Sequence, residues 1–441
     1  MSVLCGTPHP SDPMRNWVLD ILSSTLRSLV EEGYLIGNWG DVRGTADCLY
    51  ALDSCLPIDS FPRLRAHAAR WLVLRGLPEP NGFLSWEEEV WDTSVALLAL
   101  ATSPQDFSEP IRGGLRWLSK VYQRGRQNWN DEPWESSWAL LAIDSAARLR
   151  EPLDVDREAT LRWLLTLRGN PAPAQLVNCH YTALFALVAR SFVERETSAD
   201  DQELIASLRT ARQESTAFLA NRLSQAPAGE LWTREVWSNS LALWALASNE
   251  AAGALPAATL ERTITWFAKE LENPATVLTE DRAFAAVALF HLAVDLGAFQ
   301  NHSICRAAEG LADQYQDPQI RWVADYSRRR VELEIAALVR QDLGQALSSV
   351  RDMPAHPPMI TRQLFSNYYS LNLPRRPVNV IAVLAATVGI TILSRYAGGS
   401  IGGLWGTILQ WVPMSLGVLA TIGQLGNFSL ANLMDHKKGP Q

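Results

Sequence analysis

The sequence lacks the cysteine pattern of a disulfide-stabilised protein. Its five cysteines are Cys5, Cys48, Cys55, Cys179 and Cys305, an odd number without a CxxC pair. Small secreted scaffolds use even numbers of cysteines, so the sequence predicts free thiols and a reducing compartment. The N-terminus also lacks a charged region followed by an apolar run, which predicts that there is no cleavable signal peptide.

Basic charge is scarce as well. The chain has 39 Lys and Arg against 47 Asp and Glu, a formal net charge of −8. Sequence-independent binding of nucleic acid needs a basic face, so we expect no nucleic-acid partner. The hydrophobic share of 47% and the charged share of 20% instead predict a large folded core.

Complete motifs for catalysis or for a cofactor are missing too. The sequence has no Gly-rich phosphate-binding loop and no HExxH motif. Its one adjacent Cys–His pair, Cys179-His180, cannot complete a zinc site by itself. We therefore predict no metal and no cofactor. A Ser–His–Asp triad stays open, because one sequence does not show which residues meet in space.

What the sequence does contain is a repeat of about 45 residues. Pairs of an aromatic residue and leucine mark an amphipathic first helix at 71–72, 117–118, 163–164 and 218–219, with Trp266-Phe267 as a variant. A second, nearly all-apolar helix follows, ending near Leu52, Leu100, Ile143, Leu187, Leu246 and Leu289. Helices that are apolar all round must be buried. The repeat thus predicts six hairpins in a closed ring with the apolar helices inside. An open solenoid is the alternative, and an insertion around 191–208 explains the one longer gap.

Four segments carry a family resemblance. Residues 112–129 read RGGLRWLSKVYQRGRQNW, and 90–100, 133–143 and 236–246 are copies of one inner-helix start, as in VWDTSVALLAL. They resemble the Gln–Trp motifs and inner helices of squalene–hopene cyclases and protein prenyltransferase β-subunits. The resemblance covers residues 14–292 and implies an all-α (α/α)6 toroid, without implying an activity.

The motifs that carry that family's chemistry are incomplete. Residues 41–45, Asp-Val-Arg-Gly-Thr, are the closest match to DxDDT, whose middle Asp is the acid of class II terpene cyclases. Arg43 stands at that position and cannot deliver a proton near neutral pH. The run 89–93 lacks the acid as well, and Asp47 and Cys48 are adjacent where zinc-binding prenyltransferases place Asp two residues before Cys. The sequence therefore favours binding over catalysis.

The candidate binding site is the mouth of the predicted ring. Inner helices that point the same way bring their N-termini together, and their dipoles favour an anion there. Tryptophans in the same loops offer walls for an apolar or planar ligand. We therefore expect a small anionic or isoprenoid ligand. The predicted ligand-binding residues are Trp39, Asp41, Arg43, Trp91, Asp92, Trp134, Glu135, His180, Trp237 and Asp281.

Structural roles are the alternative for the same residues. The tryptophans could brace outer helices against inner ones. The polar residues could cap the inner helices by accepting from free backbone N–H groups. The predicted caps are Asp92, Ser136, Asn178 and Ser238, with Asp281 in the sixth repeat.

The C-terminal part differs from the rest. Between Pro377 and Met434 the chain has one charged residue, Arg395. Two apolar runs, 378–394 and 404–425, approach the length of about 20 residues that a membrane span needs. They predict a two-span transmembrane hairpin, and the basic residues that flank it place both termini in the cytoplasm, at a bacterial inner membrane. A hydrophobic hairpin buried in the protein is the alternative.

The predicted organisation is a toroid over 1–300, a helical cap or stalk over 301–350, a Pro-rich linker over 351–377 and the hairpin over 378–434. The predicted function is a membrane-anchored toroid that senses a ligand or a partner, with the hairpin as effector, as in bacterial defence or signalling. An isoprenoid- or lipid-processing enzyme is the alternative, and a platform for protein binding is a third. The expected partners are the lipid bilayer and a second copy of the chain, joined through the hairpin.

Overall fold

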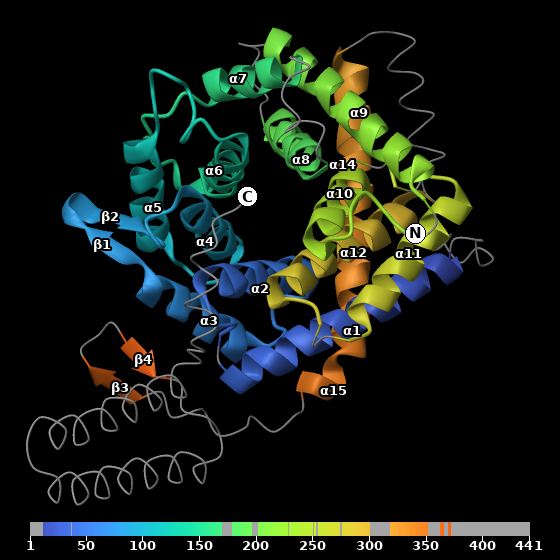
Figure 1. Ribbon diagram of the computed structural model, residues 1–441, viewed down its shortest axis with the longest axis horizontal. Helices are drawn as coiled ribbons and strands as arrows, with labels where there is room; N and C mark the ends of the chain where they lie inside the picture. The colour runs from blue at the N-terminus through green and yellow to red at the C-terminus, as the bar shows by residue number, and fades with distance from the viewer. Residues whose placement is uncertain are drawn as a thin grey trace, which may run out of the picture. The chain divides into compact units, whose positions relative to one another are not determined.

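The chain is mostly helical, which confirms the predicted all-α class (Figure 1). This computed structural model describes residues 12–36, 38–169, 179–195, 202–227, 229–249, 251–252, 255–273, 276–299, 318–351, 362–365 and 369–371. The chain divides into two compact units, residues 1–353 and 354–441.

Helices of the first unit alternate between two kinds. The odd-numbered helices are α1 (Asp12–Ile36), α3 (Pro62–Arg75), α5 (Ser108–Val121), α7 (Arg157–Gly169), α9 (Gln202–Gln225) and α11 (Ala257–Leu271). The even-numbered helices are α2 (Val42–Cys55), α4 (Val90–Thr102), α6 (Pro133–Ser145), α8 (Cys179–Arg195), α10 (Val236–Ser248) and α12 (Thr279–Phe299). We call the even-numbered set the inner helices.

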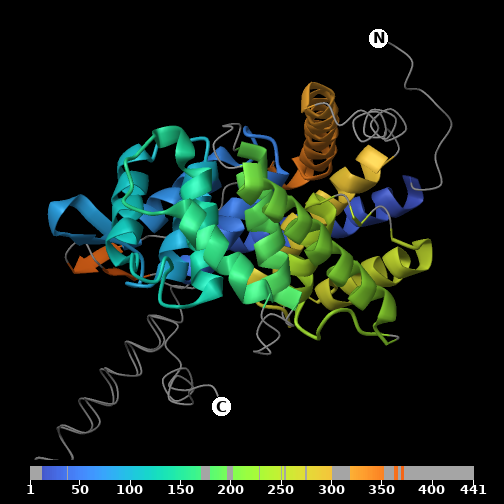
Figure 2. The ribbon, with the colours of Figure 1, turned by 90° about the horizontal axis from the view of Figure 1, so that it is seen from above.

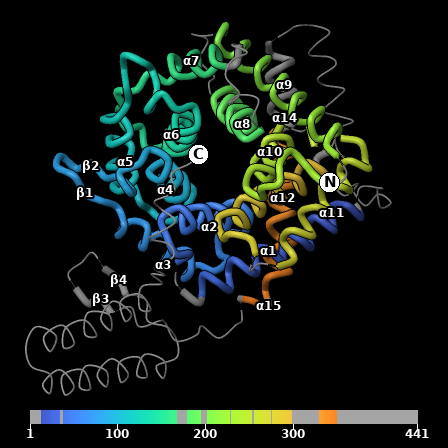
Figure 3. Tube along the Cα trace, in the orientation of Figure 1, coloured from blue at the N-terminus to red at the C-terminus, as the bar shows by residue number. Residues whose placement is uncertain are grey.

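The inner helices pack on one another in succession. Helix α2 packs on α4, α4 on α6, α6 on α8, α8 on α10 and α10 on α12, and α12 packs on α2. Figure 1 shows the odd-numbered helices outside this set, and the trace in Figure 3 follows the alternation through the unit. Their sequences explain the two positions: α4 and α10 are buried almost throughout, whereas α5 buries one face through Ile111, Leu115 and Leu118.

The predicted insertion around 191–208 falls where α8 ends and α9 begins. Residues 191–195 are the last residues of α8, and 202–208 belong to the start of α9. The described part of the segment therefore lengthens two helices. Residues 191–195 lie at the end of α8 opposite to His180.

Helix α14 (Pro318–Ala346) packs against α12 and α1, and the short α15 (Ser348–Arg351) follows it. Glu332 pairs with Arg190 of α8 at 3.1 Å, and Arg340 Nε donates to the carbonyl oxygen of Ser54 in α2 at 2.9 Å. Both partners are in the C-terminal halves of inner helices. Figure 2 shows α14 along one face of the unit, and these contacts place it at the end opposite to the inner-helix starts.

Short strands complete the described structure. In the first unit β1 (Leu77–Glu79) and β2 (Phe83–Ser85) form an antiparallel hairpin between α3 and α4. In the second unit β3 (Arg362–Phe365) pairs antiparallel with β4 (Tyr369–Leu371). This pair falls within the predicted linker, whose prolines stand before and after the strands. The predicted transmembrane hairpin, 378–434, lies outside the described residues.

Among the described residues, no helix combines the length and the apolar character that crossing a membrane requires.

Candidate functional site: the inner-helix end

Four loop tryptophans brace the first unit. Each indole N–H donates to a leucine carbonyl oxygen near the end of the preceding odd-numbered helix. The pairs are Trp39–Leu29 (2.9 Å), Trp86–Leu72 (2.8 Å), Trp129–Leu118 (2.9 Å) and Trp232–Leu219 (2.8 Å). Trp39 was predicted as a ligand-binding residue, but its side chain is 5% exposed and its indole N–H is used in this brace.

The same loops are tied to the inner helix that follows. The backbone N–H groups of Trp39, Trp86 and Trp129 donate to hydroxyl oxygens of Thr45 (3.1 Å), Thr93 (3.0 Å) and Ser136 (3.1 Å). Each tryptophan therefore joins an outer helix to an inner one through two hydrogen bonds. Ser136 has this structural role and is not a cap.

Most of the predicted caps are wrong, because the inner helices begin earlier than the polar residues suggest. The N-cap residues of α4, α6 and α10 are Glu89, Glu132 and Glu235. Asp92 and Ser238 consequently lie in the first turn of their helices, as does Asp281 in α12. The predicted cap Asn178 lies outside the described residues.

Asp41 is a true cap. Its Oδ1 accepts from the backbone N–H of Gly44 at 2.7 Å at the start of α2. This bond satisfies one of the free donors of the helix and gives Asp41 a structural role.

A second set of aromatic side chains gathers at the first turns of α4, α6, α8 and α10. Trp134 is at its centre, with ring centroids 5.3 Å from Trp91, 5.5 Å from His180 and 5.7 Å from Trp237. His180 in turn lies 4.8 Å from Trp237. We call Trp91, Trp134, Trp138, His180, Tyr181 and Trp237 the aromatic cluster. Edge-to-face packing of this kind is favourable for aromatic rings.

The cluster extends inward through Trp138. Its ring lies 5.8 Å from Trp134 and 6.1 Å from Phe284 of α12. Helices α6 and α12 are three places apart in the succession of inner helices. This contact therefore joins helices that are not neighbours in the succession.

Three polar atoms of the cluster are buried without a hydrogen-bond partner among the described residues: Nε1 of Trp91, Nε1 of Trp138 and Nδ1 of His180. Burial also lowers the pKa of His180 to about 4, so its imidazole is neutral near pH 7. Buried polar atoms of this kind are usually paired in folded proteins. They mark the cluster as a place where a ligand or water completes the bonding.

Arg43 joins the cluster to a carboxylate. Its guanidinium carbon lies 3.7 Å from the centroid of the Trp91 ring, and its Nε and a terminal nitrogen donate to Asp92 at 3.1 and 3.2 Å. Burial raises the pKa of Asp92, while Arg43 opposes that shift. The guanidinium is therefore held by an aromatic face and a carboxylate together.

Acidic side chains also gather at the inner-helix end. Burial raises the pKa of Asp47 well above its usual value, with Arg43 opposing and Glu280 adding to the shift. Burial, then Glu280 and Glu235, raises the pKa of Asp281 to about 6. We call Asp47, Asp92, Glu135, Glu280 and Asp281 the carboxylate cluster.

Glu135 belongs to the carboxylate cluster through its surroundings. Burial raises its pKa, with Glu132 and Asp92 as further causes and a hydrogen bond from Asn130 opposing. That bond joins Asn130 Nδ2 to Glu135 Oε2 at 2.7 Å.

The structure thus brings together eight of the ten predicted site residues, at the starts of the six inner helices. Trp39 and Asp41 have structural roles instead. The prediction missed Asp47 and Trp138, each four residues after a predicted residue, Arg43 or Trp134. Residues four apart share a helix face, so this spacing was the signal that would have found them.

The charge of the site opposes the predicted anionic ligand. Five carboxylates and Arg43 face this end, and the next basic residue, Arg282, is turned toward α1. Its guanidinium bonds to Ser28 and lies 2.5 Å from an oxygen of Glu32. Acidic side chains therefore outweigh the helix dipoles on which the expectation of an anion rested.

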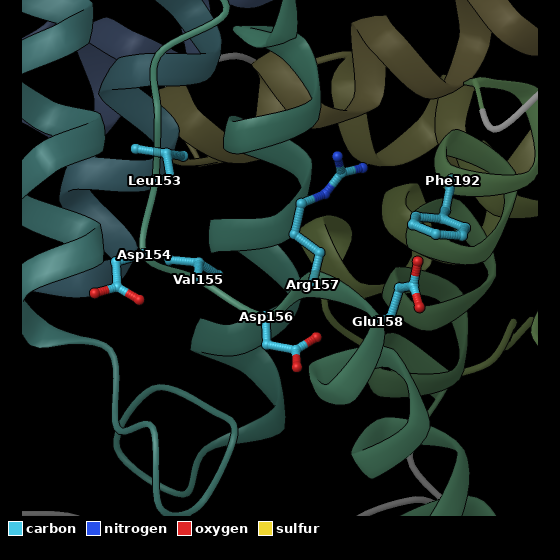
Figure 4. Close-up of a pocket in the computed structure, with 7 residues that line it drawn as sticks. All are labelled: Leu153, Asp154, Val155, Asp156, Arg157, Glu158 and Phe192. Atoms are coloured by element: carbon cyan, nitrogen blue, oxygen red, sulfur yellow. The ribbon is translucent and has the colours of Figure 1, made fainter. Parts of the chain in front are cut away.

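Two pockets lie elsewhere. One, of about 430 Å³, is lined by residues 153–158 and Phe192 (Figure 4). Its polar groups are already used: Arg157 pairs with Asp144, Asp156 Oδ1 accepts from the N–H of Ala159 at 2.9 Å, and Asp154 pairs with Arg124. The other, of about 550 Å³, lies between α14 and residues 57–60. Neither holds a predicted site residue.

Within the described part of the chain, no three His, Cys, Asp or Glu side chains are arranged to hold a metal ion. Cys48, Cys55 and Cys179 are buried free thiols.

No protein-family model matches the sequence, and no curated protein matches it either.

Proposed function

We propose that the first unit is a ligand-binding module whose site is the inner-helix end, and that the C-terminal segment connects this module to a membrane. The observation that carries the proposal is the position of Trp134, which contacts aromatic side chains from α4, α8 and α10. A side chain that touches three other inner helices can transmit a change at the site to all of them.

The finer architecture is part of the proposal. Helix α12 packs on both α10 and α2, which supports a closed (α/α)6 toroid of the squalene cyclase and prenyltransferase type over an open solenoid. The near absence of charge over 378–434 supports a two-span hairpin in a bacterial inner membrane as the effector, with self-association through it. Sensing in bacterial defence or signalling is the role that combines a ligand site with such a tail.

The test uses the full chain, purified in detergent from bacterial cells. Small molecules released from it are identified by mass spectrometry and compared with those from Trp134→Ala and from a control, Trp163→Ala, on α7. We expect a species that the wild type and the control retain and that Trp134→Ala loses. A set of molecules that is identical in all three proteins would contradict the proposal.

A specific observation also favours the alternative of an isoprenoid- or lipid-processing enzyme. Burial raises the pKa of the Asp47 carboxyl well above its usual value, which is the direction that a general acid needs. Incubation of the full chain with squalene and with farnesol, followed by gas chromatography, tests this function. A product that the wild type forms and Asp47→Asn does not would support it; no product from the wild type counts against it.

A further inference from the structure

We infer that the inner-helix end binds an organic cation, a guanidinium or alkylammonium group, between the aromatic cluster and the carboxylates of Asp47, Glu280 and Asp281. This inference rests on the proposed function, because it names the ligand class of the same site. Its support comes from the contacts of Arg43, from the surroundings of Asp47 and from the charge balance of α12.

Arg43 shows that this end of the unit can hold a guanidinium. Its cation lies on the face of Trp91 at 3.7 Å and donates two hydrogen bonds to the Asp92 carboxylate. A face of tryptophan combined with a carboxylate is a favourable environment for an organic cation. The chain therefore provides an internal example of the chemistry that we assign to a ligand.

Asp47 is a carboxyl group that has no such partner. It is 8% exposed, and its Oδ2 is buried without a hydrogen-bond partner among the described residues. The charged groups that act on the pKa of Asp47 are Arg43, Glu280, Asp41 and Asp92. All four are near the starts of inner helices, so Asp47 lies at the same end of the unit. A buried polar atom without a partner is costly, and a donor from a ligand would remove that cost.

Helix α12 adds two acidic side chains, Glu280 and Asp281, that form no ion pair with another described residue. Burial raises the pKa of Asp281, and so do the negative charges of Glu280 and of Glu235, in the neighbouring loop. Arg282, the adjacent base, is engaged by Ser28 and Glu32 on α1. Like charges at short distance disfavour one another, and a bound cation relieves that repulsion.

The aromatic cluster supplies the other wall. Trp91, Trp134 and Trp237 are each partly exposed, so part of every ring is open to a ligand at this end. A cation that contacts a tryptophan face on one side and a carboxylate on the other is stabilised by both contacts. A phosphate, by contrast, would be repelled by the carboxylate cluster.

The experiment is isothermal titration calorimetry on the full chain in detergent at constant ionic strength. The cationic probes are methylguanidinium and tetramethylammonium chloride. Methylurea is the neutral analogue of the first, and inorganic pyrophosphate and farnesol represent the anionic and isoprenoid classes. The variants are Asp47→Asn and the double variant Glu280→Gln/Asp281→Asn, and the control is Glu261→Gln on the exposed face of α11.

We expect saturable binding of a cationic probe and none of methylurea. Affinity should fall about tenfold or more in both carboxylate variants and stay unchanged in Glu261→Gln. Asp47→Asn keeps the shape of the side chain, and Oδ2 of Asp47 has no hydrogen-bond partner among the described residues, so the fold should be intact, which the melting temperature checks.

Three results would overturn the inference. Binding of pyrophosphate or farnesol that depends on Trp134 would leave the proposed function standing and make the ligand class wrong. Equal affinity of the cation for wild type and carboxylate variants would place its site elsewhere. No saturable response to either cation up to about 10 mM would reject the class, and the released-molecule comparison with Trp134→Ala would then decide the proposed function separately.

Discussion

Ionisation of Asp281, a residue of the candidate site, destabilises the folded protein. Its pKa is about 6 in the folded protein, against an ordinary value of 3.8, because of burial and the nearby Glu280 and Glu235. A raised carboxyl pKa means that the folded state binds this proton more tightly than the unfolded state. The contribution of Asp281 to the free energy of unfolding therefore falls as pH rises from about 4 to about 6. Perturbed carboxyls of this kind are typical of functional sites.

Asp281→Asn should remove the fall in the free energy of unfolding that the ionisation of Asp281 causes. Near pH 4 the variant and the wild type should unfold with the same free energy, whereas above about pH 6 the variant should be more stable by about 1–2 kcal/mol. Urea unfolding at a series of pH values measures the difference. If the variant is less stable than the wild type at high pH, the carboxylate has a favourable partner and the repulsion is wrongly assigned.

Trp39 and Trp91 differ in whether the indole N–H is used in a hydrogen bond. The indole N–H of Trp39 donates to Leu29 at 2.9 Å inside the core, whereas Nε1 of Trp91 has no partner among the described residues. Trp39→Phe removes a buried hydrogen bond and puts a smaller ring into a closely packed site, and should cost about 1–3 kcal/mol. Trp91→Phe should cost much less, since no hydrogen bond is lost. Thermal unfolding of both variants checks this order, and equal losses would contradict it.

These residues also show what the sequence could predict. The repeat predicted which residues share the inner-helix end, because equivalent positions in each hairpin fall at equivalent places. It did not separate Trp39 from Trp91, since the difference is the direction of the indole N–H, which depends on the carbonyl oxygen of another helix. Nor did it give the pairing of Arg43 with Asp92, which are 49 residues apart.

At the scale of elements, periodicity predicted the helices better than it predicted their limits. The six hairpins follow from alternating amphipathic and apolar stretches. The cap assignment put the starts of α4 and α10 too late, because Asp92 and Ser238 look like caps while Glu89 and Glu235 hold the cap positions without a side-chain cap bond. The repeated segments 90–100 and 236–246 give the first helical residues correctly. Cap preferences are weak beside the tertiary packing that extends these helices.

Close packing between α1 and the following loop depends on Gly33. A Cβ at this position would lie 2.4 Å from Cζ2 of Trp39, which itself is fixed by Leu29. Gly33→Ala should therefore destabilise the unit by about 1–3 kcal/mol, although alanine favours a helix. Gly125 is the control, since nothing lies within 4 Å of its Cβ position, and Gly125→Ala should be nearly neutral. Chemical denaturation of both variants measures the contrast; a neutral Gly33→Ala would show that the Trp39 ring moves easily.

At the scale of the whole molecule, α14 is an integral part of the first unit. Val339 and Leu343 are buried completely or almost so, and Glu332 and Arg340 reach α8 and α2. The sequence predicted a helix between the repeats and the tail, but not which inner helices it would contact. Those contacts are between residues far apart in the chain, 142 positions for Arg190 and Glu332.

The division at residue 353 leads to a prediction about the two parts of the chain. Residues 1–353 contain all inner helices and α14, so a protein ending at 353 should melt at nearly the same temperature as the first unit of the full chain. The apolar stretch 378–434 should carry membrane binding by itself. The full chain expressed in bacteria should therefore sediment with membranes and resist extraction with high salt, whereas the shorter protein should stay in the supernatant. Arg395→Leu is the matched control, since it keeps the tail and removes its one internal charge. If residues 1–353 sediment as strongly as the full chain, the anchor lies in the first unit and the effector role of the tail is wrong.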